Sequence, residues 1–418
     1  MTVPDRLKIF GKEIIDDGSI EQIKNCIGEE DLAVLTVDAH YGYGHPIGGA
    51  VAYKKHISLS GVGFDIACGN KAVRTGIKAS EIDTPKVMDE IFQRISFGEG
   101  RRNREPVNHP VLEKMGKADC QPQRTLLDLA VAQLGTVGSG NHFVDLFVDD
   151  EGDLWIGVHF GSRGFGHKTT TGFTSLAQGK SFFDRGKQGP MNSKPILFDL
   201  DSDLGQAYIA VMSLAGEYAY AGRNIVVNKV LEILGITETT FEVHNHHNFA
   251  WEEEHFGQKY WVVRKGCTPA FPDQLGFVGA NMEDTSVILK GKKTEQSKQG
   301  LYSTVHGAGR VMSRTAAAGK KKWKKGKDGI KRPTIVSKGA VDFEAVRQRL
   351  EGRVELRGSG ADEAPECYKK LDEVLAYQGE TIEILYRLHP IGVAMAGVET
   401  FDPYKDQRNN GCDPTRCR

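Results

Sequence analysis

The chain has 418 residues, of which 39% are hydrophobic and 26% are charged, and its formal net charge is -1. This composition is that of an ordinary globular protein with ample core-forming residues, and the net charge by itself predicts no polyanionic partner. Seven cysteines in a chain of this length do not suggest a disulfide framework.

The sequence carries no recognisable membrane or export signal. The longest apolar stretch, residues 391–398, is far too short to span a bilayer. The N-terminal segment "MTVPDRLKIFGKEI" lacks the charged region followed by an apolar core that marks a secretory signal. We therefore expect a cytoplasmic protein with no membrane partner.

The first third of the chain consists of short β-rich segments separated by glycines. Residues 32–40 predict a buried strand, and residues 84–95 predict a helix whose Thr-Pro start suits an N-cap and first turn. Farther along, residues 154–162 predict a strand, and residues 204–234 predict one long helix or two consecutive helices. The remaining predicted elements are strands at 260–267 and 285–291 and a helix carrying Leu371, Val374, Leu375, Ile382, Leu385 and Leu388.

The order of these elements favours an α+β fold. Strands dominate the middle of the chain, and helices interrupt them without the regular alternation that a parallel α/β sheet requires. No Pro/Ser-rich linker divides the chain, so we expect one body with long insertions. Near the C-terminus, Cys412 and Cys417 could contribute to a zinc site, but no further pair of ligands is nearby. We therefore expect a flexible tail end there.

A lysine-rich run stands out against the neutral overall charge. Residues 319–332 hold eight basic residues and Trp323 against a single acid, Asp328. The ordinary interpretation of such a run is a solvated loop. A tryptophan among lysines also favours a surface on which the lysines contact successive phosphates and the indole ring stacks on a base. Arg101, Arg102 and Arg104 form a smaller basic cluster.

Four glycine-bounded patches place possible metal ligands at the ends of apolar runs: 63–70, 138–143, 158–167 and 244–255. Asp65 and Cys68, three residues apart, suit one ion together, although a lone cysteine is more often a small buried hydrophobe. His142 or His159 alone would ordinarily be a core histidine. His244, His246 and His247 are harder to dismiss, because three imidazoles within four residues are costly without a role.

Taken together, these carboxylate, thiolate and imidazole groups suit Mn²⁺, Co²⁺ or Zn²⁺ better than Mg²⁺ or Ca²⁺. Their spacing matches no local metal motif, so the residues alone indicate a metal site that handles phosphate. In "STVHGAGRVMSRT", His306 precedes small residues able to cradle an anion, and Arg310 and Arg314 would share a helix face. His306 itself could ligate metal, act as a base, attack phosphate or pack in the core.

Ordered motifs of the chain resemble the RtcB family of RNA-splicing and repair ligases from about residue 36 to residue 397. They are "VDAHYGYGHPIG", "DIACGN", "GSGNHF", "VHFGSRGFG", "NHHNFAWEEEHFG" with "VVRKG", and "HGAGRVMSR". The resemblance implies a single catalytic body over residues 1–397, with central β-sheets flanked by helices, and a tail at 398–418 beyond the usual family end. It also implies joining of an RNA 3′-phosphate or 2′,3′-cyclic phosphate to a 5′-hydroxyl, with GTP and two Mn²⁺ ions.

The same resemblance implies roles for individual residues. His306 would attack the α-phosphate of GTP to give a histidine–guanylate, and Asp38 would orient its imidazole. Cys68 would bridge the two ions, with Asp65 and His142 completing one set of ligands and His159 and His247 the other. Nucleotide contacts fall on Asn141, Asp145, Asn281, Ser286, Gly307, Ala308, Gly309 and Tyr368, and RNA or phosphate contacts on Arg163, Arg310 and Arg314.

Three positions depart from the family pattern, all on the base-recognition side. Asp145 replaces a glutamate, Asn281 replaces a serine, and Ala396 stands where a lysine usually reaches guanine. Loss of a charged donor to the base relaxes discrimination, so guanine specificity is the open point. The alternatives are a divergent member that modifies RNA 3′-phosphate ends or uses another nucleotide, and a non-catalytic RNA-end binding protein. An archease-like activator is a further partner implied by the resemblance.

Overall fold

The computed structural model describes residues 6–184, 186–325 and 331–397. The predicted tail at 398–418, with Cys412 and Cys417, lies outside the described residues. No helix in the described part of the chain combines the length and apolar character needed to cross a membrane.

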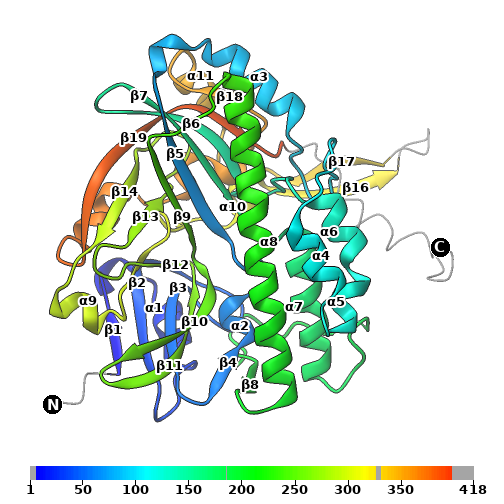
Figure 1. Cartoon of the computed structure of the whole chain (residues 1–418). Coiled ribbons are helices and arrows are strands. Elements are labelled where there is room, and N and C mark those ends of the chain that lie inside the picture. The colour runs from blue at the N-terminus through cyan, green and yellow to red at the C-terminus, as the bar shows by residue number, and fades with distance from the viewer. Residues whose placement is uncertain (1–5, 185, 326–330, 398–418) are drawn as a thin grey trace.

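The larger sheet runs through the upper part of the molecule in Figure 1, and it has eight strands among the described residues. Its order is β13 (Leu275–Val278), β14 (Ser286–Gly291), β19 (Ile382–Met395), β6 (Phe143–Asp149), β7 (Asp153–Phe160), β5 (Gly69–Lys78) and β9 (Phe241–His246), with β18 (Glu355–Arg357) beside β19. All neighbours are antiparallel except β18 and β19. This arrangement and the absence of repeated parallel crossovers among the described strands confirm the α+β prediction.

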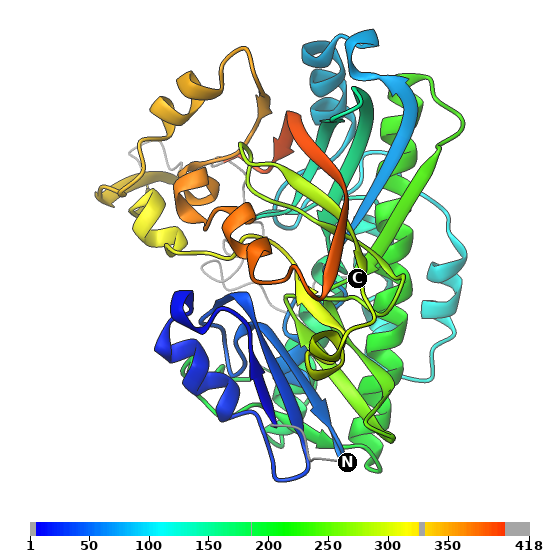
Figure 2. The ribbon, with the colours of Figure 1, turned by 90° about the vertical axis from the view of Figure 1, so that its left-hand side faces the viewer.

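A second sheet, blue and yellow-green in Figures 1 and 2, lies below the first. Its order is β1 (Leu7–Ile9), β2 (Leu32–His40), β3 (Ile47–Tyr53), β11 (Gln258–Lys265) and β10 (Asn248–His255). The chain passes from β9 of the larger sheet directly to β10 of the smaller one, with only His247 between them. Three small antiparallel pairs complete the strands: β4 (His56–Ser58) with β8 (Leu197–Asp199), β12 (Cys267–Pro269) with β15 (Ser303–Val305), and β16 (Lys320–Lys325) with β17 (Lys331–Ser337).

One long helix, α8 (Asp203–Leu234), runs alongside both sheets (Figure 1). The Ser202 side chain caps its start by accepting from the Gly205 N–H, and Gly235 in the left-handed conformation ends it. The other helices are α1 (Asp17–Lys24), α2 (Leu59–Val62), α3 (Thr84–Arg94), α4 (Pro110–Gly116), α5 (Gln121–Thr125), α6 (Leu127–Gln133), α7 (Arg163–Ala177), α9 (Glu295–Gln299), α10 (Arg314–Ala318), α11 (Phe343–Leu350) and α12 (Leu371–Ala376), with short 3₁₀ turns η1 (Lys12–Ile14), η2 (Ala79–Glu81), η3 (Ala361–Glu363) and η4 (Pro365–Cys367).

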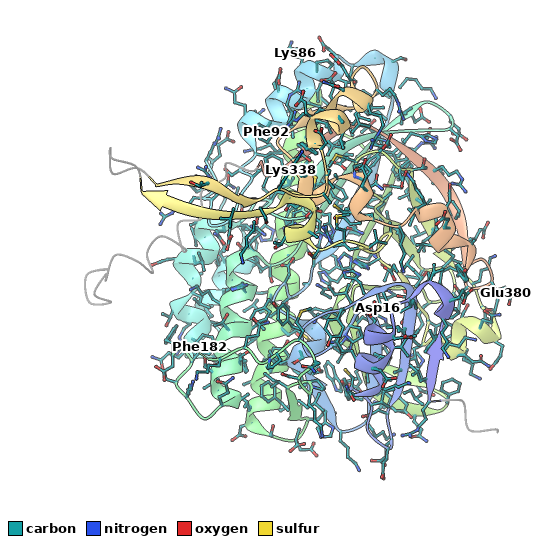
Figure 3. All side chains as sticks on the ribbon, turned by 180° about the vertical axis from the view of Figure 1, so that it is seen from behind. Asp16, Lys86, Phe92, Phe182, Lys338 and Glu380 are labelled. Atoms are coloured by element: carbon teal, nitrogen blue, oxygen red, sulfur yellow. The ribbon has the colours of Figure 1, made fainter. Side chains whose placement is uncertain are left out.

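Most predicted elements are confirmed, and residues 204–234 form a single helix rather than two. The C-terminal prediction is wrong in its second half, because the helix ends at Ala376 and Ile382 begins the long strand β19. The lysine-rich run is also not a plain loop: residues 320–325 and 331–337 pair as the hairpin β16–β17, which projects from the body in Figures 1 and 3. Residues 326–330 of that run lie outside the described residues.

Candidate active site

Four predicted metal-ligating patches meet where the two sheets join. Strands β6, β7, β5 and β9 are consecutive neighbours, and their register places Phe143 opposite His159 and Gly69 opposite both Phe160 and His246. The candidate ligands Cys68, His142, His159 and His247 stand at or next to these paired positions, and Asp65 lies four residues before Gly69. Residues far apart in sequence therefore come together at one edge of the larger sheet.

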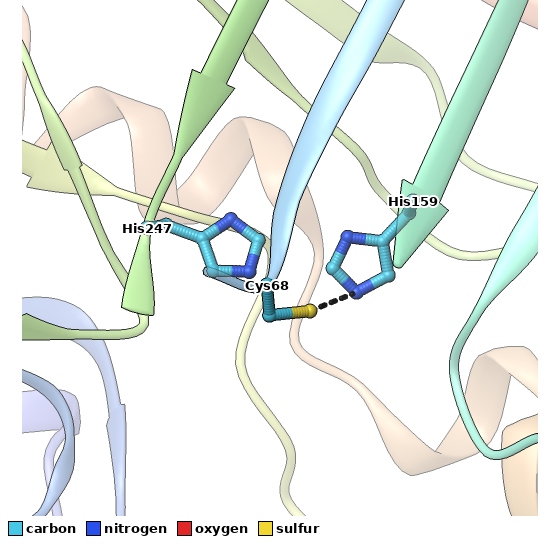
Figure 4. A group of neighbouring side chains, drawn as sticks. All are labelled: Cys68, His159 and His247. Atoms are coloured by element: carbon cyan, nitrogen blue, oxygen red, sulfur yellow. Dashed lines mark hydrogen bonds between the residues drawn. The ribbon is translucent and has the colours of Figure 1, made fainter. Parts of the chain in front are cut away.

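The thiol of Cys68 lies at the centre of this cluster. Its Sγ is 3.6 Å from Nε2 of His142 and 3.7 Å from Nε2 of His159. Asp65 Oδ2 is 2.9 Å from His142 Nε2. Possible donor atoms form two groups that share Cys68, one with Asp65 and His142 and one with His159 and His247, each within 4.8 Å of one another. Figure 4 shows the imidazoles of the second group on either side of the thiol.

Outer contacts orient the imidazoles toward Cys68. His142 Nδ1 lies 3.0 Å from the Val137 carbonyl oxygen, and His159 Nδ1 lies 2.6 Å from Asn70 Oδ1. A hydrogen bond at Nδ1 leaves the Nε2 lone pair available to a metal, as in many protein metal sites. Nδ1 of His247 is buried and has no hydrogen-bond partner among the described residues. The residues present thus fit a pair of divalent cations that share a thiolate.

The electrostatics of the cluster agree with that fit. Burial, together with neighbouring cationic groups, holds the pKa values of His159 and His247 well below their usual range, which favours the neutral form that a metal ligand requires. Burial would raise the pKa of Asp65, but His142 and Arg163 outweigh it and keep the carboxylate ionised. Burial and the Asp65 charge raise the pKa of the Cys68 thiol, and a bound cation would favour its thiolate form.

His306 follows β15 and belongs to neither group of possible metal ligands. Its Nδ1 lies 2.7 Å from Asp38 Oδ2, and its backbone N–H donates to the same oxygen at 3.1 Å. The Thr36 hydroxyl donates to the other carboxylate oxygen at 2.6 Å. Asp38 is fully buried, yet His306 keeps its pKa below the usual value. An ionised carboxylate at Nδ1 fixes the proton there and leaves Nε2 with a lone pair.

A cavity of about 370 Å³ joins His306 to the metal-ligand cluster. The ring centroids of His306 and His247 are 5.0 Å apart. The other predicted residues that line the cavity are Asp65, Cys68, Asn141, Asp145, His159, Asn281, Gly307, Ala308, Gly309, Arg310, Arg314 and Tyr368. Gly309 has φ +76°, and a Cβ there would lie 2.3 Å from the Asp38 carbonyl oxygen, so this wall needs glycine.

Four of the predicted residues do not line the cavity: Asp38, His142, Arg163 and Ser286. Asp38 contacts His306, as described above, and His142 contacts Cys68. Arg163 starts α7 at φ +58°, with Nη1 3.3 Å from His142 Nδ1. Ser286 is buried, and its hydroxyl accepts the Ala280 N–H at 3.0 Å, so it shapes the loop that carries Asn281.

The prediction that Arg310 and Arg314 share a helix face is wrong. Arg310 forms an isolated bridge with Tyr368, and α10 begins only at Arg314. Both guanidiniums instead converge on Glu363, to which Tyr368 also donates its hydroxyl hydrogen. Arg310 lies 4.9 Å from the centre of the Tyr368 ring. The sequence reasoning missed Glu363, although it lies in the "DEAPECY" segment that includes Tyr368.

The side chains of Asn281 and Asp145 differ in their hydrogen bonding. The Asn281 side chain bonds within its own turn: Nδ2 donates to Asp284 at 2.8 Å, and Oδ1 accepts two backbone N–H groups. Asp145 in β6 is buried, and its Oδ1 has no hydrogen-bond partner in the described part of the chain. Burial raises the pKa of Asp145 well above the usual value, which favours the protonated form of this cavity-lining carboxyl.

Replacing Asp145 with asparagine is expected to weaken the pH dependence of folding stability. With a raised folded-state pKa, Asp145 stabilises the protein most at low pH and loses that contribution as pH rises through that pKa. The introduced amide does not titrate, so the free energy of unfolding should change less between mildly acidic and neutral pH than in the natural chain. Urea unfolding at both pH values measures this, with exposed Asp201→Asn as control. An unchanged pH dependence would show that Asp145 is already ionised.

His244 and His246 belong to neither group of possible metal ligands, and both contact the guanidinium of Arg223. Arg223 of α8 is fully buried and donates to His244 Nε2 at 2.8 Å, with its Nη2 2.9 Å from His246 Nδ1. Its Nη1 donates to the carbonyl oxygens of Ala67 at 3.0 Å and Phe160 at 2.6 Å. Among the described residues, no carboxylate is bonded to this guanidinium. Arg223 therefore ties together the residues that precede Cys68 and follow His159.

Arg223→Lys is expected to weaken Mn²⁺ binding by about 10–100-fold, the usual cost of losing an outer partner of a metal site. Lysine keeps the charge but cannot reproduce the forked contacts to two carbonyl groups and two imidazoles. Mn²⁺ titration followed by electron paramagnetic resonance measures the affinity, and thermal unfolding reports whether the fold persists. Arg94→Lys, on an exposed ion pair with Glu232, is the matched control. Natural affinity in a folded Arg223→Lys chain would refute this positioning role.

Comparisons with known proteins support the family resemblance. A family model described as "tRNA-splicing ligase RtcB" matches residues 20–123 and 112–396. The RNA-splicing ligase RtcB of Escherichia coli (strain K12) is 31% identical over 86% of this chain and 88% of that protein. The tRNA-splicing ligases RtcB of Archaeoglobus fulgidus and Thermococcus kodakarensis are 29% and 27% identical, over 94% and 93% of this chain and 95% of each relative.

Proposed function

The chain belongs to the RtcB family, and on that premise we propose that it is an RNA ligase of tRNA splicing or RNA repair. In this proposal it joins an RNA 3′-phosphate or 2′,3′-cyclic phosphate to a 5′-hydroxyl, using GTP and Mn²⁺ in the cytoplasm. Residues 1–397 would form the catalytic body. The observation that carries the proposal is the His306–Asp38 pair, 2.7 Å apart, in the cavity that also contains the Cys68 cluster.

His306 is the proposed nucleophile. Because Asp38 holds the proton on Nδ1, the Nε2 lone pair is free to attack the α-phosphorus of GTP. A bond forms between Nε2 and phosphorus, and pyrophosphate leaves. A 2′,3′-cyclic phosphate is first opened by water, which breaks the bond between phosphorus and the 2′ oxygen and leaves a 3′-phosphate. The guanylate then passes from Nε2 to the RNA 3′-phosphate, and attack by the 5′-hydroxyl releases GMP and forms the phosphodiester.

Other residues hold charge around this histidine. Asn141 and residues 307–309 line the cavity beside His306 and supply a small, polar cradle for the α-phosphate. Arg310 and Arg314 are paired with Glu363, so phosphate binding would compete with that carboxylate.

Two Mn²⁺ ions would be held by the two ligand groups that share Cys68. When bound, such a pair stabilises the negative charge that develops on phosphoryl oxygens. The protein prepares the site by keeping His159 and His247 neutral and by directing Nε2 of His159 at the shared thiol.

A second candidate, use of another nucleotide, is favoured by the burial of Asp145 in the cavity wall, with Oδ1 lacking a hydrogen-bond partner among the described residues and the pKa raised. A carboxylate accepts two hydrogen bonds from a guanine edge, whereas a protonated carboxyl offers one donor and one acceptor. Competition among nucleotides in the joining assay separates this candidate from GTP specificity.

The test is an RNA-joining assay. One RNA ends in a 3′-phosphate and the other begins with a 5′-hydroxyl, and the full chain is supplied with Mn²⁺ and each nucleotide in turn. Joined product with GTP supports the proposal, and product with another nucleotide alone supports the second candidate. Tight binding of both RNA ends without joining under any condition would identify a non-catalytic RNA-end binding protein.

A further inference from the structure

A buried thiol–hydroxyl contact lies behind the pair formed by His306 and Asp38. The Sγ of Cys267 is 3.6 Å from the hydroxyl oxygen of Thr36, and that oxygen is 2.6 Å from Asp38 Oδ1. Cys267, Thr36 and Asp38 are all fully buried. Neither Cys267 nor Thr36 lines the cavity, and neither belongs to a group of possible metal ligands. The contact is therefore separate from the site described above, but it is one hydroxyl group away from the carboxylate that holds His306.

The position of Cys267 is set by segments that form the site. Its backbone N–H donates to the His247 carbonyl oxygen at 3.1 Å. Its partner in the β12–β15 pair is Val305, which directly precedes His306. Gly266 has φ +63°, and a Cβ there would lie 2.9 Å from His306 Cε1, so the backbone before Cys267 packs closely against the imidazole. The thiol is thus held in a fixed place relative to both histidines.

The Thr36 hydroxyl has one hydrogen and two oxygen acceptors within reach. They are Asp38 Oδ1 at 2.6 Å and the Gly48 carbonyl oxygen at 2.9 Å. Although burial opposes it, His306 holds the pKa of Asp38 below its usual value, and 2.6 Å is the length of a bond between a hydroxyl and an ionised carboxylate. The hydrogen that points to Asp38 cannot also serve Gly48, but the hydroxyl oxygen still has lone pairs that accept.

Cys267 supplies a donor for those lone pairs. Of the atoms that contact Thr36 Oγ1 among the described residues, only the sulfur of Cys267 carries a hydrogen. Burial and the Asp38 charge raise the pKa of this thiol, which favours its protonated form. A donor on one side of a hydroxyl group turns the hydroxyl hydrogen to the other side, and successive hydrogen bonds polarise one another. The thiol therefore favours Asp38 over Gly48 as the acceptor.

We propose that Cys267 and Thr36 are positioning residues for the nucleophile His306. Cys267 donates to the Thr36 hydroxyl and directs its hydrogen to Asp38, which holds that carboxylate against the imidazole. Without the thiol, the Thr36 hydrogen turns to Gly48 for part of the time, and an oxygen lone pair then faces the carboxylate. The expected effect on catalysis rests on the proposed transfer of guanylate to His306.

The first experiment is a double-mutant cycle on the rate of label transfer from GTP to the full chain, measured against GTP concentration at saturating Mn²⁺. Cys267→Ala should slow the maximal rate about threefold to tenfold, with little change in the GTP concentration that gives half of it. Thr36→Val should slow it about tenfold to 100-fold, whereas Thr36→Ser keeps the hydroxyl and should behave like the natural chain. In the double variant Cys267→Ala/Thr36→Val, loss of the thiol should have no further effect, because the thiol acts through the hydroxyl.

Cys26→Ala is the matched control, since Cys26 is also buried but its thiol contacts the carbonyl oxygens of Gln22 and Gly44. Thermal unfolding shows that each variant is folded. A natural rate in the folded Cys267→Ala chain, or effects of the two substitutions that simply add, would overturn the inference.

Proton NMR provides a second measurement that needs no catalysis. The downfield Nδ1 proton of His306, identified by its absence from His306→Ala, should shift in Cys267→Ala and stay in place in Cys26→Ala. An unchanged resonance in Cys267→Ala would also overturn the inference. Absence of label transfer in the natural chain would count against the proposed function, and the NMR comparison would still decide whether the thiol acts on the pair formed by His306 and Asp38.

Discussion

Cys68→Ser is expected to abolish tight Mn²⁺ binding to both ligand groups and to reduce RNA joining by more than about 100-fold. Cys68 is the one residue common to the two groups, so its loss damages both cation sites at once. Loss of an outer partner of a metal site already costs about 10–100-fold, and loss of a shared ligand exceeds that. Serine has nearly the same shape, but its hydroxyl does not ionise as readily as a thiol.

Calorimetric titration with Mn²⁺ measures the number of bound ions and their affinity, and the joining assay measures activity. Cys120→Ser is the matched control, because Cys120 is a free cysteine outside both ligand groups. Thermal unfolding shows whether the Cys68→Ser substitution leaves the fold intact. Two Mn²⁺ ions bound to the Cys68→Ser chain with natural affinity would contradict the assignment of Cys68 as the shared ligand.

Asp38→Asn should slow nucleotide transfer to His306 by about 10³–10⁴-fold, the scale seen when a carboxylate that fixes a catalytic histidine tautomer is replaced by an amide. The introduced amide is able to donate to Nδ1, which places the imidazole proton on Nε2 and removes the nucleophilic lone pair. Thr36 still has an oxygen to contact, whereas the His306 backbone N–H loses the acceptor that it shares with Nδ1, so thermal unfolding is used to show that the fold persists.

The rate of label transfer from GTP to the protein measures this effect, with Mn²⁺ held at saturation. Asp372→Asn, which alters an exposed ion pair with Arg387, is the control. Mn²⁺ affinity should stay close to natural in the Asp38→Asn chain, because Asp38 belongs to neither ligand group. A natural rate of label transfer would mean that Asp38 does not set the protonation of His306.

The sequence predicted elements well where local pattern and tertiary environment agree. The strand at 32–40 and the helix at 204–234 have clear periodicity and end signals, and both are present. The segment from Ile382 to Leu388 fits a helical spacing equally well, but pairing with β14 and β6 makes it a strand. Strand formation depends on neighbours that local sequence does not identify.

The candidate site, like the fold, could be predicted from the sequence only in part. The sequence motifs identified the candidate ligands around Cys68, but the spacing of these residues in the sequence could not show that they lie together. The strand order β6–β7–β5–β9 brings them together. Arg223 was missed since a helix position gives no sign of the carbonyl groups that it contacts. Arg310 and Arg314 are four residues apart, a spacing that is typical of one helix face, but Arg310 lies before the helix that begins at Arg314. The sequence therefore did not predict that both pair with Glu363.

The most direct test of the account is covalent labelling of His306. The full chain is incubated with Mn²⁺ and α-labelled GTP, and the labelled peptide is identified by mass spectrometry after the acid lability of the bond has been checked. The account predicts an acid-labile guanylate on His306 that is absent from His306→Ala and retained in His56→Ala, a histidine that does not line the cavity. Label on another residue, or RNA joining by the His306→Ala chain, would contradict it.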